Sequence, residues 1–271
     1  MYAGTTFRKG SGSIVGVHQK IDRVARRLLK KKLGRTSDFP TISQILHFEG
    51  NNGPDAIKRK SPSKDEPWHF IDPAKPDDRA LVGLINDHIY NLSEALRSDN
   101  NVRAAFEAAW LAHAVVDGLT PAHHYPLNDK IEELWGKPHH ERLTIADKNI
   151  IHGNGGLDTI SKNWQYWGVG GVFSAHLSFE LGVASTIATL KFSDIDPTPA
   201  EFRRVEKDGF ETVFNEALYK IYHMKMYDEF GASGWTRRLA IQTRDVLIPE
   251  IMRTVCLAWY YAAYLAKSEK S

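Results

Sequence analysis

Apolar residues recur three and four positions apart through most of this chain. This is the period of an amphipathic α-helix, in which such positions share one face. Alternating patterns typical of strands are scarce. The sequence therefore predicts an all-α fold, a single helical domain over residues 1–271 in which residues 1–13 can be disordered. The predicted helices cover residues 16–32, 77–97, 100–119, 172–191, 199–228 and 236–266.

Polar and glycine-rich segments indicate where the helices begin and where they are interrupted. Asp99 or Asn100 is suited to cap one helix, and Thr198 followed by Pro199 is suited to begin another. Residues 48–76 are rich in proline and glycine, and residues 126–170 in glycine, asparagine and tryptophan. Long irregular segments in a compact domain are often functional. We expect both to form loops at one end of the domain.

Composition narrows the classes of function only slightly. The net charge of +2 is too small to indicate a nucleic-acid partner by bulk electrostatics. The basic residues between Arg23 and Arg35 alternate with apolar ones at helical spacing, which favours a solvated helix face over a phosphate or membrane patch. Cys256 is the only cysteine, so an internal disulfide is excluded and any metal ligands must be histidines and carboxylates.

The chain carries no obvious signal for a membrane or for export. No run of eighteen apolar residues exists, so no transmembrane segment is expected. The first residues lack the apolar core of a signal peptide, which by sequence alone favours a cytoplasmic location. Nothing in the sequence indicates an obligate protein partner.

The most informative stretch runs from His113 to His123. His113 and Asp117 are four residues apart on a predicted helix, so their side chains reach the same region of space. Pro121 cannot continue the helix, which allows the chain to bring His123 back toward this pair. Imidazole and carboxylate groups together suit Zn²⁺ and similar metals. Twelve histidines could also produce this spacing by chance.

Other histidines and acids have both a functional and an ordinary interpretation. His176 and Glu180 form a second pair four apart, and a helical pair of this kind is more often a solvated ion pair than a metal site. Asp55 follows Gly53-Pro54 and could simply be a turn residue. His69, beside Trp68, could be a packed loop histidine.

Taken in order, these residues resemble the ligand series of the zinc-dependent phospholipase C / S1-P1 nuclease superfamily, and more closely its bacterial phospholipase C branch. The matching stretches, over residues 14–185, are Val17-His18, Gly53-Pro54-Asp55, His69-Phe70-Ile71-Asp72, the segment from His113 to His123, and His176 to Glu180. The resemblance implies an all-helical domain with long loops at the end that holds zinc. It also implies a secreted protein, by the habit of the superfamily, so the location is left open between secreted and cytoplasmic.

The resemblance also implies which residues would hold each zinc ion. Asp55, His69, His113 and Asp117 would hold one ion; His123, His176 and Glu180 a second; and His18 with Asp117 a third. The superfamily completes the third site with the amine and carbonyl of an N-terminal tryptophan, whereas this chain begins Met1-Tyr2. We therefore expect two or three zinc ions, with Asp22, one turn after His18, as a hypothetical substitute ligand.

The expected activity is hydrolysis of phosphodiester bonds, in which zinc neutralises phosphate oxygens, lowers the pKa of water and stabilises the leaving oxygen. Asp55 would be the catalytic base or the carboxylate that orients water, and Phe70 and Asp72 would contact substrate. The substrate is most simply a phospholipid headgroup, with transient contact to a membrane surface. The alternative is a nucleotide phosphodiester, as in a single-strand nuclease or 3′-nucleotidase, where Phe70 would stack a base.

Two functions from other classes are alternatives to this one. A di-iron helical bundle needs two helical Glu-x-x-His motifs, and the only match, from Glu66 to His69, contains Pro67. A non-catalytic helical scaffold, stapled by its metal ions, remains open. The segment from His123 to His176 is longer than the superfamily leads us to expect, and we predict that it forms a lid or a substrate wall.

Overall fold

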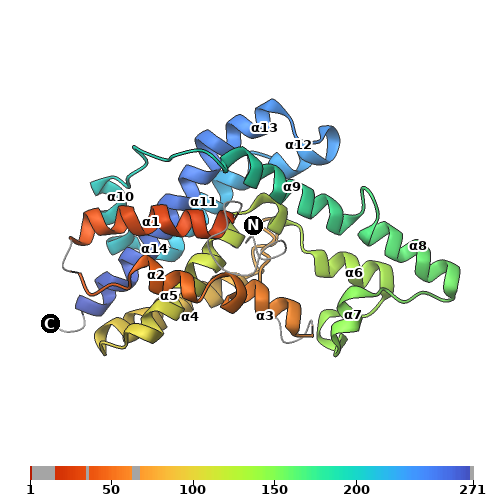
Figure 1. Cartoon of the computed structure of the whole chain (residues 1–271), viewed down its shortest axis with the longest axis horizontal. Helices are drawn as coiled ribbons and strands as arrows, with labels where there is room; N and C mark the ends of the chain where they lie inside the picture. The colour runs from red at the N-terminus through yellow and green to blue at the C-terminus, as the bar shows by residue number, and fades with distance from the viewer. Residues whose placement is uncertain (2–15, 35–36, 63–67, 269–271) are drawn as a thin grey trace.

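The computed structural model describes residues 1, 16–34, 37–62 and 68–268. The disorder predicted for residues 1–13 therefore falls, apart from Met1, outside the described residues. Every regular element in the described part of the chain is helical and none is a strand, which confirms the all-α prediction (Figure 1). No helix among the described residues is long and apolar enough to cross a membrane.

The helices vary from one turn to about six turns in length. In chain order they are α1 (Val17–Leu33), α2 (Ile42–His47), η1 (Gly50–Asn52), α3 (Pro54–Lys60), α4 (Ala80–Arg97), α5 (Asn101–Gly118), η3 (Pro121–His124), α6 (Leu127–Trp135), η4 (His139–Glu141), α7 (Ile145–Asn149), α8 (Gly156–Trp167), α9 (Val172–Ile187), α10 (Pro199–Asp208), α11 (Phe210–Tyr222), α12 (Met226–Ser233), α13 (Arg237–Gln242), η5 (Thr243–Leu247) and α14 (Ile248–Ser268).

Helix α5 lies at the centre of the helical body and packs against α4, α14 and α2. Its buried residues include six alanines, whose small side chains let the neighbouring helices approach closely. Trp259 of α14 is fully buried, and its indole Nε1 donates a hydrogen bond to the carbonyl of Ala108, 2.8 Å away. The last turn of α5, which carries Asp117, is therefore held in a rigid, close-packed setting.

The predicted helix starts are confirmed. The side chain of Asn100 accepts a hydrogen bond from the backbone N–H of Arg103 and caps α5. Thr198 caps α10 by accepting from the N–H of Glu201, with Pro199 in the first turn. In both cases the side-chain oxygen satisfies an N–H that the helix itself leaves without a partner.

Two predicted long helices are interrupted. The helix expected over residues 199–228 breaks at Gly209, whose φ of 80° separates α10 from α11. The helix expected over residues 236–266 contains a π-helical stretch, η5, just before Pro249. Proline has no N–H to continue the regular hydrogen-bond ladder, so the preceding turn widens.

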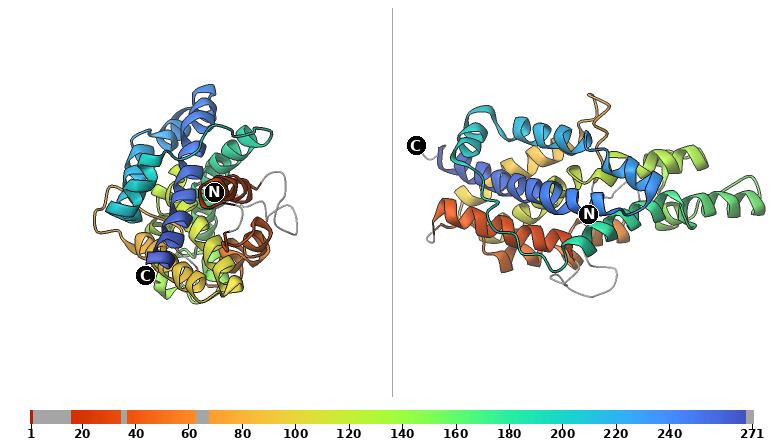
Figure 2. Two further views of the ribbon diagram at one scale, coloured as in Figure 1. Left: turned by 90° about the vertical axis from the view of Figure 1, so that its left-hand side faces the viewer. Right: turned by 90° about the horizontal axis from the view of Figure 1, so that it is seen from above.

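The prediction of an irregular loop over residues 126–170 was wrong, because this segment folds into α6, η4, α7 and α8. These elements project from one end of the helical body as an arm (Figures 1 and 2). Ile131, Ile151 and Tyr166 form a small apolar core of the arm's own. Likewise, residues 48–76 contain η1 and α3. Short helices rich in glycine, asparagine and proline are hard to recognise from apolar periodicity alone.

Gly118 should be essential to the packing at the end of α5. A Cβ atom at this position would lie 2.7 Å from Cζ of Phe214 and 2.9 Å from Cδ2 of Leu81, both in the core. We expect Gly118→Ala to lower the free energy of unfolding by about 1–3 kcal/mol, the usual cost of overpacking. Urea denaturation measures this change.

The matched control is Gly83→Ala, on the exposed side of α4, where an added Cβ would meet nothing within 4 Å. Alanine is a better helix former than glycine, so this variant should raise the free energy of unfolding by about 0.5–1 kcal/mol. Equal effects of the two substitutions would contradict the packing argument.

Candidate metal centre

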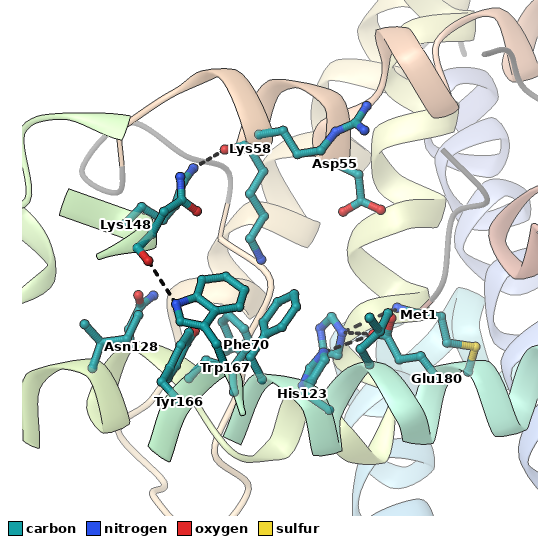
Figure 3. Close-up of a pocket in the computed structure, with 17 residues that line it drawn as sticks. Met1, Asp55, Lys58, Phe70, His123, Asn128, Lys148, Tyr166, Trp167 and Glu180 are labelled. Carbon is teal, nitrogen blue, oxygen red and sulfur yellow. Dashed lines mark hydrogen bonds and ion pairs between the residues drawn. The ribbon is translucent and has the colours of Figure 1, made fainter. Parts of the chain in front are cut away.

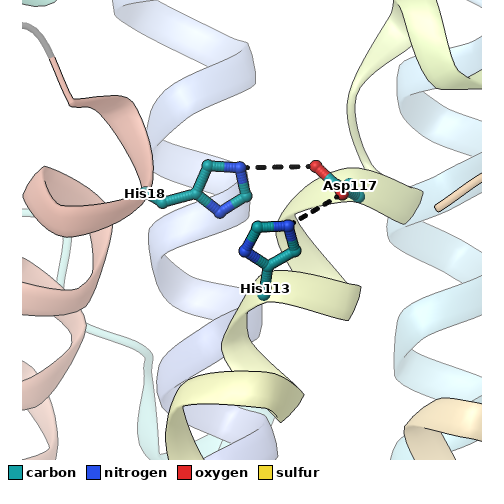
Figure 4. Close-up of side chains that lie close together, drawn as sticks. All are labelled: His18, His113 and Asp117. Carbon is teal, nitrogen blue, oxygen red and sulfur yellow. Dashed lines mark ion pairs between the residues drawn. The ribbon is translucent and has the colours of Figure 1, made fainter. Parts of the chain in front are cut away.

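The centre is built around the last turn of α5, where His113 and Asp117 lie one helical turn apart (Figure 4). His113 Nε2 lies 3.2 Å from Asp117 Oδ2. His18, near the start of α1, approaches from the other side, with its Nε2 3.4 Å from Asp117 Oδ1. All three side chains are almost fully buried. His113 thus reaches the Asp117 carboxylate through helical spacing within α5, and His18 reaches it through a contact between two helices distant in sequence.

The chain returns to this point immediately after α5. The helix ends at Gly118, and η3, which begins at Pro121, brings His123 back toward Asp117. The carbonyl of His123 accepts the backbone N–H of Ile71, which ties the segment carrying His69 to η3. The return of His123 that the proline suggested is therefore present in the structure.

Within the described residues, three groups of side chains could hold metal ions. In each group the candidate ligand atoms all lie within 4.8 Å of one another. All eight ligands named from the sequence belong to these groups, which are His18–His113–Asp117, Asp55–His69–His113 and His123–His176–Glu180. Imidazole nitrogens together with carboxylate oxygens suit zinc and similar borderline metals.

Hydrogen bonds outside the groups orient two of the imidazole rings. Nδ1 of His123 lies 2.7 Å from the carbonyl oxygen of His69. A carbonyl can only accept, so Nδ1 carries the proton and Nε2 of the neutral ring presents a lone pair. That Nε2 lies 3.0 Å from Glu180 Oε1, inside the third group. Metal-binding histidines are commonly oriented by such a bond on the other nitrogen.

Glu49 orients His113 in the same way. Glu49 is buried, and its Oε1 accepts from Nδ1 of His113 at 3.1 Å. The opposite nitrogen, Nε2, is buried 3.2 Å from Asp117 Oδ2 and 3.6 Å from Asp55 Oδ1, yet it forms no hydrogen bond with any described residue. Buried polar atoms are almost always satisfied. A bound cation would satisfy this nitrogen, so the residues fit a metal.

Sequence reasoning missed Glu49. It lies 64 residues from His113, and no local spacing connects the two. Only its place in the proline- and glycine-rich segment marked it as part of a region of interest.

The buried carboxylates of the site are stabilised in their ionised form by positive charge nearby. Burial favours protonation of Asp117, but His123, the Met1 amine and His113 outweigh it and hold the pKa of Asp117 well below its ordinary value. Burial is outweighed in the same way at Glu180, whose pKa is held low by the Met1 amine, His176 and His123. Both carboxylates are therefore ionised at neutral pH.

Three histidines of the centre have shifted pKa values. Burial lowers the pKa of His69 and His123 to about 4, so both are neutral ligands at pH 7. Burial also acts to lower the pKa of His113, but the carboxylates of Glu49 and Asp117 outweigh it and hold this pKa well above its ordinary value. A metal ion bound at Nε2 of His113 would have to displace a proton, which couples metal binding to pH.

Met1 contributes backbone atoms to the centre. Its amine lies 2.6 Å from Asp117 Oδ1 and 3.4 Å from Glu180 Oε1, and its carbonyl oxygen lies 2.8 Å from His18 Nε2. Burial works to lower the pKa of this amine, but the carboxylates of Asp117, Glu180 and Asp55 raise it to about 10. An amine, a carbonyl, an imidazole and a carboxylate thus meet at one point.

A pocket of about 460 Å³ opens onto the centre (Figure 3). Met1, Asp55, His123 and Glu180 stand at one end of it, and the arm supplies the opposite wall. Side chains of Asp55 and Glu180 are 29% and 10% exposed, against 1% for Asp117. Asp55 is therefore the carboxylate of the centre that a molecule in the pocket reaches most easily.

The two residues predicted to contact substrate differ in position. Phe70 lines the pocket and stacks on His123, with ring centroids 5.2 Å apart. Asp72 is not among the residues that line the pocket; it accepts the N–H of Ala74 and forms an ion pair with Lys75. Its role as a substrate contact stays a prediction.

Asp22 is not part of any of the three groups. It is fully buried, and burial together with the neighbouring Glu49 raises the pKa of its carboxyl well above the ordinary value. A protonated carboxyl would be a poor metal ligand, so the structure does not support the hypothesis that Asp22 replaces a missing ligand.

Glu49→Gln should weaken metal binding without removing a ligand. The amide keeps the shape of the side chain but loses the charge that holds Nδ1–H of His113, so zinc affinity should fall roughly 10–100-fold. Competition with a chromophoric chelator measures the zinc Kd. Glu216→Gln, an exposed acid in α11 that pairs with Arg204, is the control. An unchanged Kd in Glu49→Gln would refute the orienting role.

Comparison of this chain with known protein families, with curated proteins and with solved structures finds no match in any of the three.

Proposed function

We propose that this protein is a zinc-dependent hydrolase of phosphodiester bonds, of the type found in the zinc-dependent phospholipase C / S1-P1 nuclease superfamily. The observation that carries the proposal is the close packing of three candidate metal groups beside a single pocket, whose lining includes Asp55 of one group and His123, His176 and Glu180 of another. The groups share members, because His113 belongs to two of them and Asp117 contacts residues of all three. Such an arrangement suits several closely spaced cations.

The resemblance in sequence predicted the ligands, and the placement of Met1 supports the third site. The superfamily uses the amine and carbonyl of an N-terminal tryptophan there. Here the amine of Met1 contacts Asp117 and its carbonyl contacts His18. These backbone atoms do not depend on the side chain, so methionine can provide them as well as tryptophan.

Bound zinc ions would neutralise the phosphate and lower the pKa of a nearby water. Around them, the chain's own residues position the reactants. Burial favours protonation of Asp55, but His113 and His69 outweigh it and lower the pKa of its carboxyl. An ionised, weakly basic carboxylate at the pocket end accepts a hydrogen bond from water and orients it more effectively than it removes a proton.

Helix α8 of the arm favours a phospholipid over a nucleotide as the substrate. Helix α8 exposes Leu157, Ile160 and Trp164 at positions three and four apart, with exposed fractions of 86%, 67% and 65%. The same helix ends in Tyr166 and Trp167, which line the pocket. An apolar ridge with a tryptophan suits the surface of a bilayer. By contrast, Asp72, the expected partner of a base, is outside the pocket lining.

The test of the activity is hydrolysis of bis-p-nitrophenyl phosphate by the zinc-loaded protein, with and without a chelator. Asp117→Asn should lose bound zinc and reduce kcat/KM roughly a thousandfold or more, since the electrostatic stabilisation depends on the ions. Asp129→Asn, an exposed acid of α6, should leave both unchanged. Retention of full zinc content and turnover in Asp117→Asn would exclude the proposed centre.

Turnover also separates the enzyme from a metal-stapled scaffold. A protein that binds zinc stoichiometrically, is stabilised by it and hydrolyses no phosphodiester, lipid or nucleotide, would be the scaffold. Parallel assays on phospholipid vesicles and single-stranded DNA would then rank the phospholipase and nuclease alternatives.

Contact with a lipid surface should depend on the ridge of α8. Ile160→Asp places a charge in the middle of it, and loss of one buried apolar side chain should weaken binding to phospholipid vesicles roughly tenfold or more. Co-sedimentation with vesicles measures this partition. Val102→Asp is the matched control, because Val102 is 70% exposed but lies at the start of α5, away from the arm. Equal binding by both variants would reject the ridge as the contact.

A further inference from the structure

The pocket contains a cation that the metal centre does not use. Lys58, on α3, is half-buried and lines the pocket together with Asp55 of the same helix. Figure 3 shows its side chain extending into the pocket toward Phe70. Its Nζ lies 5.0 Å from the centre of the Phe70 ring.

No carboxylate among the described residues pairs with the Lys58 ammonium. Asp55 and Glu180 are the acidic residues lining the pocket, and both belong to the candidate metal groups. An ammonium group that faces a pocket without a counter-ion can attract an anionic part of a ligand. Arg59, which lines the same pocket, adds a second positive charge.

Phe70, the aromatic residue of the pocket that contacts the centre, already has two ring partners. Lys58 lies over the ring of Phe70, and His123 stacks on it at an interplanar angle of 28°. A quaternary ammonium headgroup is recognised by free aromatic faces and by acidic side chains. Here the ring has a cation and an imidazole as its neighbours, and the acids serve the centre. At this ring the positive charge of Lys58 therefore disfavours a cationic headgroup; the other aromatic residues of the lining, Tyr166, Trp167 and Phe173, lie on α8 and α9.

The position of Lys58 is fixed by the arm. Lys148 of α7 donates a hydrogen bond to the carbonyl of Lys58 and another, of 2.6 Å, to the carbonyl of Ser61. Trp167, at the end of α8, donates to the carbonyl of Asn149 at 2.9 Å. The bonds of Lys148 tie α3 to the arm, and the bond of Trp167 holds α7 and α8 of the arm together, so the backbone from which Lys58 projects is anchored to the arm.

We propose that Lys58 sets the substrate class of the pocket: it admits phospholipid phosphodiesters with an uncharged or anionic headgroup and discriminates against those with a quaternary ammonium headgroup. This selectivity rests on the proposed function, since it names the substrate of the same site. It is a binding property, however, and can be measured without turnover.

The experiment compares two phosphate monoesters as probes, glycerol phosphate and phosphocholine, by calorimetry with the zinc-loaded protein. They share the phosphate and differ in the charge of the attached group. The unmodified protein should bind glycerol phosphate roughly tenfold more tightly or better, as expected for a unit charge a few ångströms away in a partly shielded site. Lys58→Met should bring the two affinities close together, and Lys58→Arg should keep the preference.

The control is Lys60→Met, because Lys60 is exposed on α3 and does not line the pocket. It should leave the ratio of affinities unchanged, and zinc content should be equal in all variants. Equal binding of both probes by the unmodified protein, or an undiminished preference in Lys58→Met, would overturn the proposal. Tighter binding of thymidine monophosphate than of glycerol phosphate would overturn the lipid headgroup as the occupant.

The two failures are distinguishable. Absence of bis-p-nitrophenyl phosphate hydrolysis would refute the proposed function while leaving the binding preference measurable. Hydrolysis without the preference would refute the role of Lys58 alone.

Discussion

The buried carboxylate of Asp117 is the constraint on which the rest of the centre depends. It lies in the last turn of α5, where the unpaired carbonyls of a helix already create partial negative charge. Placing an ionised acid there, with almost no exposure to water, is stable only if positive charge or hydrogen-bond donors surround it. The chain brings His18, His69 and the Met1 amine to this carboxylate from three distant segments. The fold around the end of α5 is arranged to satisfy that one group.

By the same constraint, a metal ion bound in this site would compete with protons. The proton on His113 and the ammonium of Met1 provide the positive charge that the acids require. A divalent ion provides the same charge more compactly and also satisfies Nε2 of His113, which no described residue does. The attraction of the site for a cation therefore follows from its buried charges and does not depend on any particular reaction.

Sequence patterns predicted the parts of the fold and the site that depend on local spacing. The pair His113 and Asp117 is one turn of helix, and Asn100 and Thr198 are capping residues whose partners lie three positions away. The sequence pattern did not predict the break at Gly209 or the π-helical turn before Pro249. Both residues stand in the sequence, but the helix period of apolar residues continues across them.

The other features of the fold and the site could not be predicted from local sequence patterns. Glu49 and Met1 reach the centre only through the packing of helices that are distant in sequence, and their own neighbours carry no spacing signal. The role of Lys58 depends equally on the arm, whose short helices were predicted as a loop. Phe70 was identified from its motif, yet whether its ring is free or covered is a property of the folded pocket.

The separate core of the arm has a consequence for how the pocket opens. Ile131, Ile151 and Tyr166 pack with one another and not within the main core, so the arm and the helical body are distinct cooperative units. A few hydrogen bonds, such as those of Lys148, join them across the pocket. Breaking these bonds costs far less than unfolding α5 or α14, whereas α9 joins the two units, because its Val172 and Phe173 pack on the arm's core and its Phe179 and Val183 lie in the main core. Local opening on the side of Lys148 would therefore change access to the pocket while the candidate ligands on α5 and α9 remain in place.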